Sequence, residues 1–231
     1  MKSLTSLAII AAVFPCLVSS LAAQQEIKVR AISFQPGFPA EIHAHQPDGA
    51  ATAGMVEVKS FLNHESNPLK FKGNKLVFTA RSSPVSATDV NQLLANVEIP
   101  TGAKSLILLF LPESAEPGNF HSRVLAIDDS AKAFPGGSFK VANLGSLPLK
   151  IQLEKESFEF APGEIRVIAK PPFGDNQSAS MEAYIKRDGQ WALMSSGSWP
   201  NPGTRRVLEI VTENLTTKQA ELKGIRDVVV P

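Results

Sequence analysis

From residue 23 onward, hydrophobic and polar positions alternate in many short runs, which proline, glycine, asparagine and serine separate. Alternating runs of about four to eight residues are typical of half-buried β-strands. Helical patterns are confined to two short stretches, 86–95 and 217–223. The pattern therefore predicts an all-β chain of the sandwich class. Its predicted strands are Ile27–Ile32, Met55–Phe61, Lys75–Ala80, Ser105–Leu111, Arg123–Ile127, Ser138–Asn143, Leu149–Leu153, Ile165–Ala169, Met181–Lys186, Gln190–Met194, Val207–Thr212 and Ile225–Val230.

The clearest single element is a hairpin around Asp188-Gly189. Apolar and polar residues alternate from Met181 to Lys186, Asp-Gly supplies the positive φ angles of a tight turn, and Trp191 begins the return strand. Alternation places Tyr184 on the same face as the charged residues of the first strand. Tyr184 is therefore predicted to be exposed.

The chain also contains internal similarities. Asn63–Phe71 recurs as Asn143–Ile151, with matching Asn, Ser, Pro, Leu and Lys and no gap. Two further pairs lie in order around it, Val29–Ile32 with Val124–Ile127 and Pro100–Ile107 with Asn201–Leu208. They predict two tandem immunoglobulin-like sandwich domains, residues 23–121 and 122–231, each of a usual size for that fold. One larger sandwich is the alternative.

The first 22 residues have the order of a secretory signal peptide. Lys2 precedes an apolar run, and small residues follow up to Ala22, where cleavage is expected. The run is shorter than the roughly 20 apolar residues that a membrane-spanning helix needs, so we expect no transmembrane segment in the mature chain. The mature protein is expected in the periplasm, at the cell surface or secreted.

Removal of the signal peptide changes both the charge and the available chemistry. Cys16 is the only cysteine and is lost, and without Lys2 the 23 basic side chains become 22, equal to the 22 acidic ones. A neutral chain lacks the basic excess that a nucleic-acid partner requires. Thiolate chemistry and disulfides are likewise excluded from the mature protein.

Histidine is scarce, and two of the four histidines are close together. His43 and His45 are spaced to lie on one face of a strand, and Met55 follows shortly after them. Imidazole and thioether ligands suit copper, so these three residues are a candidate metal site. A blue-copper centre is excluded because it needs a cysteine thiolate.

Catalytic motifs are absent from the sequence. It contains no Gly-x-Ser-x-Gly nucleophile elbow and no glycine-rich phosphate loop after a strand. We therefore predict no catalytic residue and no cofactor. A hydrolase whose carboxylates meet only in the folded protein is a further alternative.

Tyr184, Trp191 and Trp199 hold the only tyrosine and both tryptophans in a short stretch. Such rings could bind a protein or stack on a carbohydrate if they are exposed, whereas a core tryptophan is the alternative. The favoured prediction is a non-catalytic exported binding or structural protein of the cell envelope, with a periplasmic copper-binding protein as alternative. Tandem sandwiches behind a signal peptide resemble the layout of periplasmic pilus chaperones, in architecture only.

Overall fold

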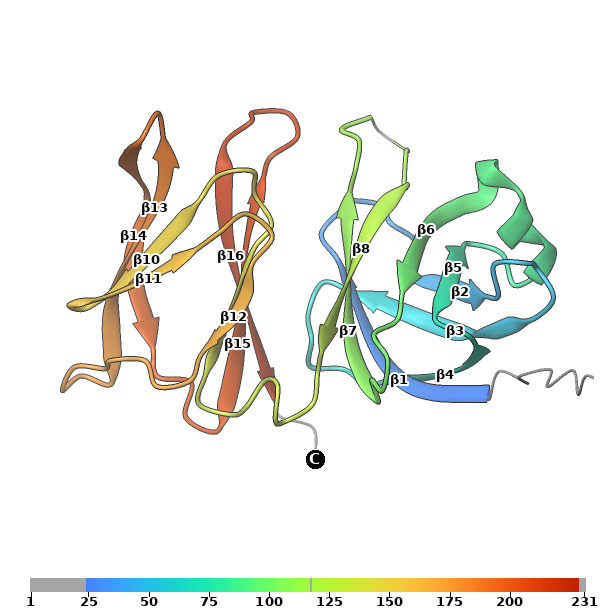
Figure 1. Cartoon of the computed structure of the whole chain (residues 1–231), viewed down its shortest axis with the longest axis horizontal. Coiled ribbons are helices and arrows are strands. Elements are labelled where there is room, and N and C mark those ends of the chain that lie inside the picture. The colour runs from blue at the N-terminus through green and yellow to red at the C-terminus, as the bar shows by residue number, and fades with distance from the viewer. Residues whose placement is uncertain (1–23, 117, 229–231) are drawn as a thin grey trace, which may run out of the picture.

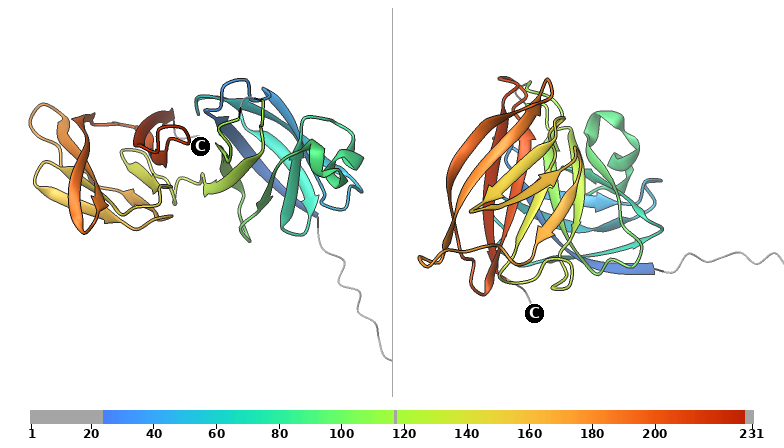
Figure 2. Two further views of the ribbon diagram at one scale, coloured as in Figure 1. Left: turned by 90° about the horizontal axis from the view of Figure 1, so that it is seen from above. Right: turned by 60° about the vertical axis from the view of Figure 1, so that its left-hand side comes forward.

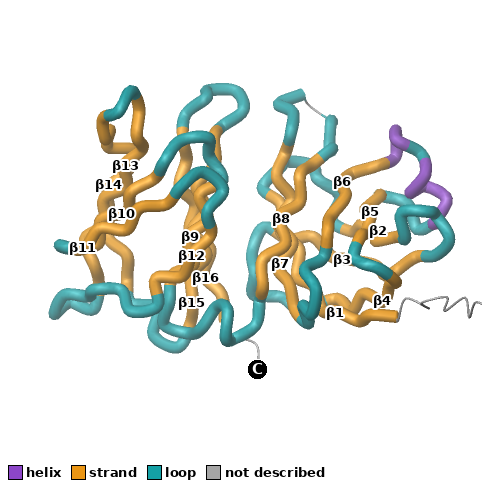
Figure 3. The backbone as a smooth tube through the Cα atoms, viewed as in Figure 1, coloured by secondary structure: helices purple, strands orange, loops and turns teal. Residues whose placement is uncertain are grey.

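The computed structural model describes residues 24–116 and 118–228, so the predicted signal peptide lies outside the described residues. The chain is all-β, as predicted (Figure 1, Figure 3). Its strands are β1 (Gln24–Ser33), β2 (Glu41–His45), β3 (Thr52–Lys59), β4 (Asn67–Lys72), β5 (Lys75–Thr79), β6 (Leu93–Glu98), β7 (Ser105–Pro112), β8 (Ser122–Asp128), β9 (Phe139–Asn143), β10 (Leu149–Leu153), β11 (Glu156–Phe160), β12 (Ile165–Ile168), β13 (Ser178–Arg187), β14 (Gln190–Pro200), β15 (Arg205–Glu213) and β16 (Ala220–Val228). Two short 3-10 helices, η1 (Pro84–Thr88) and η2 (Val90–Gln92), join β5 to β6.

Both predicted helical stretches were wrong. The stretch 86–95 forms η1, η2 and the start of β6, and the stretch 217–223 leads into β16. Pro84 at the start of η1 and the Asp89 side chain, which accepts a hydrogen bond from the Asn91 amide, favour tight turns over a continued helix.

Strands β1–β8 and β9–β16, called here the first half and the second half, pair in the same order. The second half consists of two sheets, β11-β10-β13-β14 and β12-β9-β15-β16. The first half has the matching orders β3-β2-β5-β6 and β4-β1-β7-β8, and a short parallel pairing of β1 with β3 joins them into one sheet. Even the parallel pair recurs, since β1 pairs with β7 as β9 pairs with β15. The halves therefore have the same strand topology.

Two of the three sequence similarities join strands that are not equivalent in this shared topology. Asn63–Phe71 leads into β4 and Asn143–Ile151 into β10, which occupy different places in their sheets. The second pair is also mismatched, since it aligns β1 with β8. Only the third, which aligns the turns before β7 and β15, joins equivalent strands. Proline and asparagine turns recur before strands of any position, so such matches report turn chemistry.

The division into two domains at residues 121 and 122 stays a prediction. Strand β8 follows that point, yet it pairs with β7 along its whole length, from Leu106 with Asp128 to Pro112 with Ser122. The pairing favours a division after Asp128, and we propose that one. The immunoglobulin-like assignment of each half is likewise a prediction.

Four sheet layers enclose three hydrophobic cores. The first core lies inside the first half and includes Val29, Phe78 and Leu108, and the second lies inside the second half around Phe139 and Ile151. The third core joins the halves, because β1, β7 and β8 pack their outward faces against those of β15 and β16. Figure 2 shows the two halves side by side in this arrangement. The third core comprises Ile32, Leu62, Ile107, Leu109, Leu111, Ile127, Phe134, Leu208, Ile210 and Ile225.

Four buried charges lie between the halves beside this third core. Arg30 of β1 donates to both carboxylate oxygens of Asp129 and of Asp227, with ion-pair distances of 2.8 and 2.7 Å. Arg206 of β15 also contacts both aspartates and donates to the Phe134 carbonyl. All four side chains are at most 3% exposed. The Arg30, Asp129, Arg206 and Asp227 side chains are called the charge cluster below.

The charge cluster is fully paired in spite of its burial. Burial by itself lowers the pKa of Arg30, but hydrogen bonds to Asp227 and Asp129 and their negative charges outweigh it and raise the pKa. A buried pair of this kind contributes little net stability, yet removal of one partner leaves an uncompensated charge and is costly. The cluster therefore ties the orientation of one half to the other.

Candidate functional site

The predicted hairpin forms between β13 and β14, with the turn at Asp188 and Gly189, whose φ angles are 49° and 80°. It lies at the end of the molecule away from the contact between the halves (Figure 1). A bulge shifts the register after Ala183, so that Tyr184 pairs with Leu193. Beyond the bulge, β14 continues to Pro200, further than the predicted Gln190–Met194.

Tyr184 and Trp191 lie on the outer face of this sheet, each half-buried. The Nζ atom of Lys150 on β10 lies 4.3 Å from the ring centroid of Tyr184 and 4.9 Å from that of Trp191. Lys186 places its Nζ 5.5 Å from the Trp191 ring. Leu193 beside them is 57% exposed. We call these five side chains the aromatic face.

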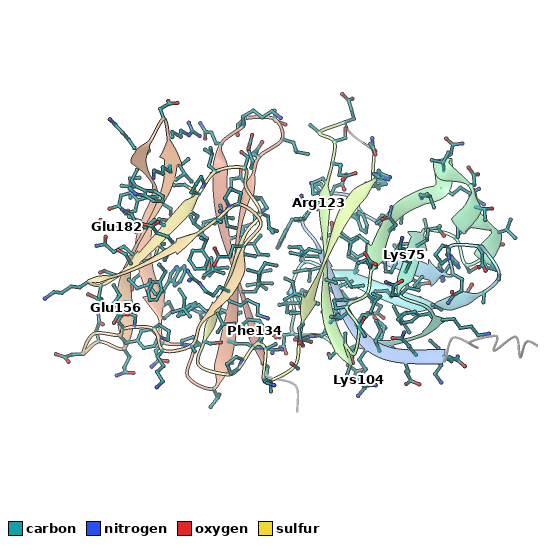
Figure 4. The ribbon with its side chains drawn as sticks, viewed as in Figure 1. Lys75, Lys104, Arg123, Phe134, Glu156 and Glu182 are labelled. Atoms are coloured by element: carbon teal, nitrogen blue, oxygen red, sulfur yellow. The ribbon has the colours of Figure 1, made fainter. Side chains whose placement is uncertain are left out.

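Glu182 orients Tyr184 on this face. The Tyr184 hydroxyl donates a hydrogen bond to the Glu182 carboxylate, and this bond raises the pKa of Tyr184. Figure 4 shows Glu182 on the outer sheet of the second half. Tyr184 is thereby anchored at its hydroxyl while its ring contacts Lys150.

Trp199 does not belong to the aromatic face. It is 6% exposed and stacks on Phe139 with ring centroids 4.6 Å apart, inside the core of the second half. The bulge explains the difference, because it changes the facing of β14 residues relative to a simple alternation from Trp191. We therefore remove Trp199 from the predicted binding group.

Three cationic side chains lie on or beside the aromatic face near the hairpin turn. Lys150, Lys186 and Arg187 form no ion pair with any described residue. Glu159, the cross-strand neighbour of Lys150, also forms none with it. Opposite charge on a partner would complement these cations.

The predicted metal residues lie close together, but not as a free ligand set. His43 pairs with Met55 across β2 and β3, and the rings of His43 and His45 are 6.3 Å apart. His45 is fully buried, with Nδ1 3.1 Å from the Thr52 hydroxyl and Nε2 3.0 Å from both the Thr79 hydroxyl and the Arg81 carbonyl. Burial lowers the pKa of His45. Both of its nitrogens are engaged, so the geometry does not favour metal binding.

The described residues also contain no cluster of three or more of the common metal-binding side chains. Over residues 24–116 and 118–228, no group of three or more histidine, cysteine, aspartate or glutamate side chains could hold a metal ion. Copper binding by His43, His45 and Met55 stays a prediction.

A cleft of about 820 Å³ opens between the halves, at the ends of β7, β8, β15 and β16. Its apolar lining includes Phe34, Leu111 and Ile210, and its charged lining includes Arg123 and Glu213. Figure 4 shows where Arg123 lies on β8. Sequence patterns missed this cleft because its walls come from segments far apart along the chain. Charges of both signs line it, so it has no clear preference for a ligand charge.

Glu209 of β15 is a buried carboxylate inside the second half. It is 5% exposed and lies over Gly224, where an added Cβ would be 2.8 Å from its Oε1 atom. No hydrogen bond joins its carboxylate to another described residue, and burial raises its pKa to about 7. Glu209 is therefore a group whose charge state changes near neutral pH.

Comparisons with known proteins give little information. No family model and no curated protein matches the chain. A solved structure of a "putative cell adhesion protein" from Bacteroides ovatus aligns over 90% of this chain and 99% of its own, at 9% identity and a TM-score of 0.24. Another so described, from Parabacteroides distasonis, aligns over 91% and 98%, at 7% identity and a TM-score of 0.16. Likeness of this degree carries no argument about function.

The helices offer no evidence of a membrane span. Within the part of the chain that the structure describes, none is long and apolar enough to cross a bilayer.

Proposed function

We propose that this chain is a non-catalytic exported binding protein of the cell envelope, which binds a protein partner through the aromatic face. The observation that carries the proposal is the grouping of the half-buried rings of Tyr184 and Trp191 with the exposed Leu193 and two lysines on one outer sheet face. Tryptophan and tyrosine dominate the binding energy of protein interfaces when a partner covers them.

The lysines favour a protein partner over a carbohydrate. Sugars stack on bare ring faces, whereas Lys150 and Lys186 place ammonium groups over these rings. A protein surface can supply both carboxylates for the cations and apolar side chains for Leu193. Carbohydrate binding is therefore an outcome that the experiment must test.

Metal carriage and hydrolysis have less support. His45 would have to give up its contacts with Thr79 and the Arg81 carbonyl before it could bind an ion. Among the described residues, Glu209 is the one carboxylate whose pKa is raised to about 7, but it lies inside a packed sandwich and no described nucleophile is hydrogen-bonded to it.

The test uses the mature protein, residues 23–231, immobilised and exposed to an envelope extract, with captured proteins identified by cross-linking and mass spectrometry. The affinity of the captured partner is then measured for the unaltered protein and for Trp191→Ala and Tyr184→Ala. We expect each substitution to weaken binding about tenfold or more. Val90→Ala is the matched control, because Val90 is 75% exposed on the first half.

A glycan array runs in parallel with the same proteins. If the protein binds a glycan and Trp191→Ala abolishes that binding, the partner is a carbohydrate and not a protein. Equal partner affinity of Trp191→Ala, Tyr184→Ala and Val90→Ala would show that the aromatic face is not the binding surface.

A further inference from the structure

Strand β14 is the edge of its sheet, beside the aromatic face. It is the last strand in the order β11-β10-β13-β14, and no described strand pairs with its other side. With 11 residues it is also long for an edge strand. An open edge of this kind offers a row of backbone donors and acceptors to another strand.

The other edge strands of the described chain carry protecting charges, and β14 does not. Its sequence, QWALMSSGSWP, contains no charged residue, and only its bulge and the terminal Pro200 interrupt it. Edges are normally protected by charged side chains, which oppose pairing with another chain. The charged residues of the other edges are Lys70 and Lys72 on β4, Glu98 on β6, Arg123 and Asp128 on β8, Glu156 and Glu159 on β11, Arg166 on β12, and Glu221, Lys223 and Arg226 on β16.

Two hydrogen bonds show which β14 residues direct their backbone groups outward. The Lys186 amide donates to the Pro148 carbonyl, and the Ser180 carbonyl accepts from the Glu154 amide, so both bonds point away from β14. Their cross-strand partners are Trp191 and Ser198. In an antiparallel pair, residues at such positions direct their N–H and C=O groups to the opposite side. Trp191 and Ser198 therefore present backbone groups to the open edge.

Charge and apolar surface beside this edge define what would fit there. Lys150, Lys186 and Arg187 form no ion pair with any described residue, and the one carboxylate beside Tyr184 on this face, that of Glu182, accepts a hydrogen bond from the Tyr184 hydroxyl. An added strand would place alternate side chains on the outer face, next to Trp191 and Leu193. Carboxylates at these alternate positions would meet the lysines, and apolar side chains at the intervening positions would lie on the inner side of the sheet.

We infer that β14 is the docking edge for an extended strand of the partner protein, in which acidic and apolar residues alternate. The inference rests on the proposed function and specifies its partner. The strand extends the sheet by backbone hydrogen bonds, and its acidic side chains meet the cations of the aromatic face.

The experiment measures fluorescence polarisation of labelled (Val-Glu)4, (Val-Lys)4 and a (Val-Glu)4 analogue with alternate amides N-methylated. The mature protein is compared with Ser198→Pro, which removes one outward amide and leaves the bonds to β13 intact, and with Ser198→Val as the matched control. We expect (Val-Glu)4 to bind, and Ser198→Pro or N-methylation to weaken it about tenfold. Ser198→Val should change affinity less than about twofold, and (Val-Lys)4 should bind at least about tenfold more weakly.

No binding of (Val-Glu)4 at about 1 mM, or equal binding of its N-methylated analogue, overturns the inference. The N-methylated probe needs no altered protein, so a folding defect of Ser198→Pro leaves the test intact. A mature protein that sediments as a dimer and becomes monomeric on Ser198→Pro would assign the edge to a second copy. If Trp191→Ala weakens the captured partner but Ser198→Pro does not, the proposed function stands and strand addition fails.

Discussion

The two halves share one strand topology, but the outer sheet is covered by a connection in the first half and open in the second. In the first half, the connection 80–92 folds as η1 and η2 over β5, where the Ser86 hydroxyl lies 2.8 Å from that of Thr79. His45 and Thr79 on this face are consequently fully buried. In the second half, a two-residue turn joins the equivalent strands β13 and β14, and no described segment covers Tyr184 and Trp191 in this way. The length of one connection thus decides whether a sheet face is core or surface.

A second difference concerns the interior positions of the equivalent strands β7 and β15. Leu106, Leu108 and Phe110 of β7 all belong to the first core. In β15, Glu209 lies between the core residues Val207 and Val211. The second half therefore contains a buried ionisable side chain on the inner face of β15, whereas the inner face of the equivalent strand β7 is apolar.

The largest effect is expected where the halves meet. Asp227→Ala leaves Arg30 and Arg206 buried with one aspartate between them, so it should lower the free energy of unfolding by about 3 to 5 kcal/mol. Urea denaturation measures this loss. Glu26→Ala is the control, since its ion pair with Lys70 is exposed and should cost less than about 1 kcal/mol. Equal losses for both would show that the charge cluster does not hold the halves together.

The buried carboxylate of the second half should make stability depend on pH. The pKa of Glu209 is 4.5 in the unfolded chain and about 7 in the folded protein. Its contribution to the free energy of unfolding is therefore most favourable below about pH 4.5. Stability then falls as pH rises through about 7, by about 3 kcal/mol in total. Glu209→Gln should remove this dependence when unfolding is measured from pH 5 to pH 9. An unchanged pH profile would contradict burial of the charge.

The covered face of the first half should be sensitive to loss of its histidine. His45→Ala removes the contacts with Thr52, Thr79 and Arg81, so we expect a loss of about 2 to 3 kcal/mol in unfolding free energy. His43→Ala is the matched control, because His43 is only partly buried and should cost less than about 1 kcal/mol. Copper that stabilised the unaltered protein but neither variant would be incompatible with a purely structural His45.

The smallest effect is expected on the open face of the second half. Tyr184→Ala should lower the free energy of unfolding by less than about 1 kcal/mol, because the ring is half-exposed and contacts Lys150 from the solvent side. Thermal unfolding compares it with His45→Ala. A loss as large as that of His45→Ala would mean that the aromatic face is structural, and the contrast between the two outer sheets would disappear.

Much of the fold was predictable because strand alternation is local. The hairpin at Asp188-Gly189 formed as expected, since its turn and its flanking pattern lie within a few residues. Strands β2, β4, β6 and β11 were missed. Each has only five or six residues, but β5, β9, β10 and β12 are as short and were predicted, so length alone does not explain why these four were missed. The end of β14 was missed because serine and glycine replace β-formers there.

Of the candidate site, Tyr184 and Trp191 were predicted from one hairpin and lie together on its outer face. Lys150 was not predicted with them, since it comes from β10 and meets Tyr184 only through sheet pairing. Trp199 was misplaced because a bulge, which a local pattern does not reveal, alters the facing of β14.

Local residue order was thus sufficient for the all-β class, for most of the strands and for the hairpin at Asp188-Gly189. The remaining features depended on long-range contacts. Arg30 and Asp227 are 197 positions apart, and neither is recognisable as buried until the halves pack and exclude water from both. The same holds for the cleft and for the open edge of β14, since an edge exists only when the order of all strands in a sheet is settled.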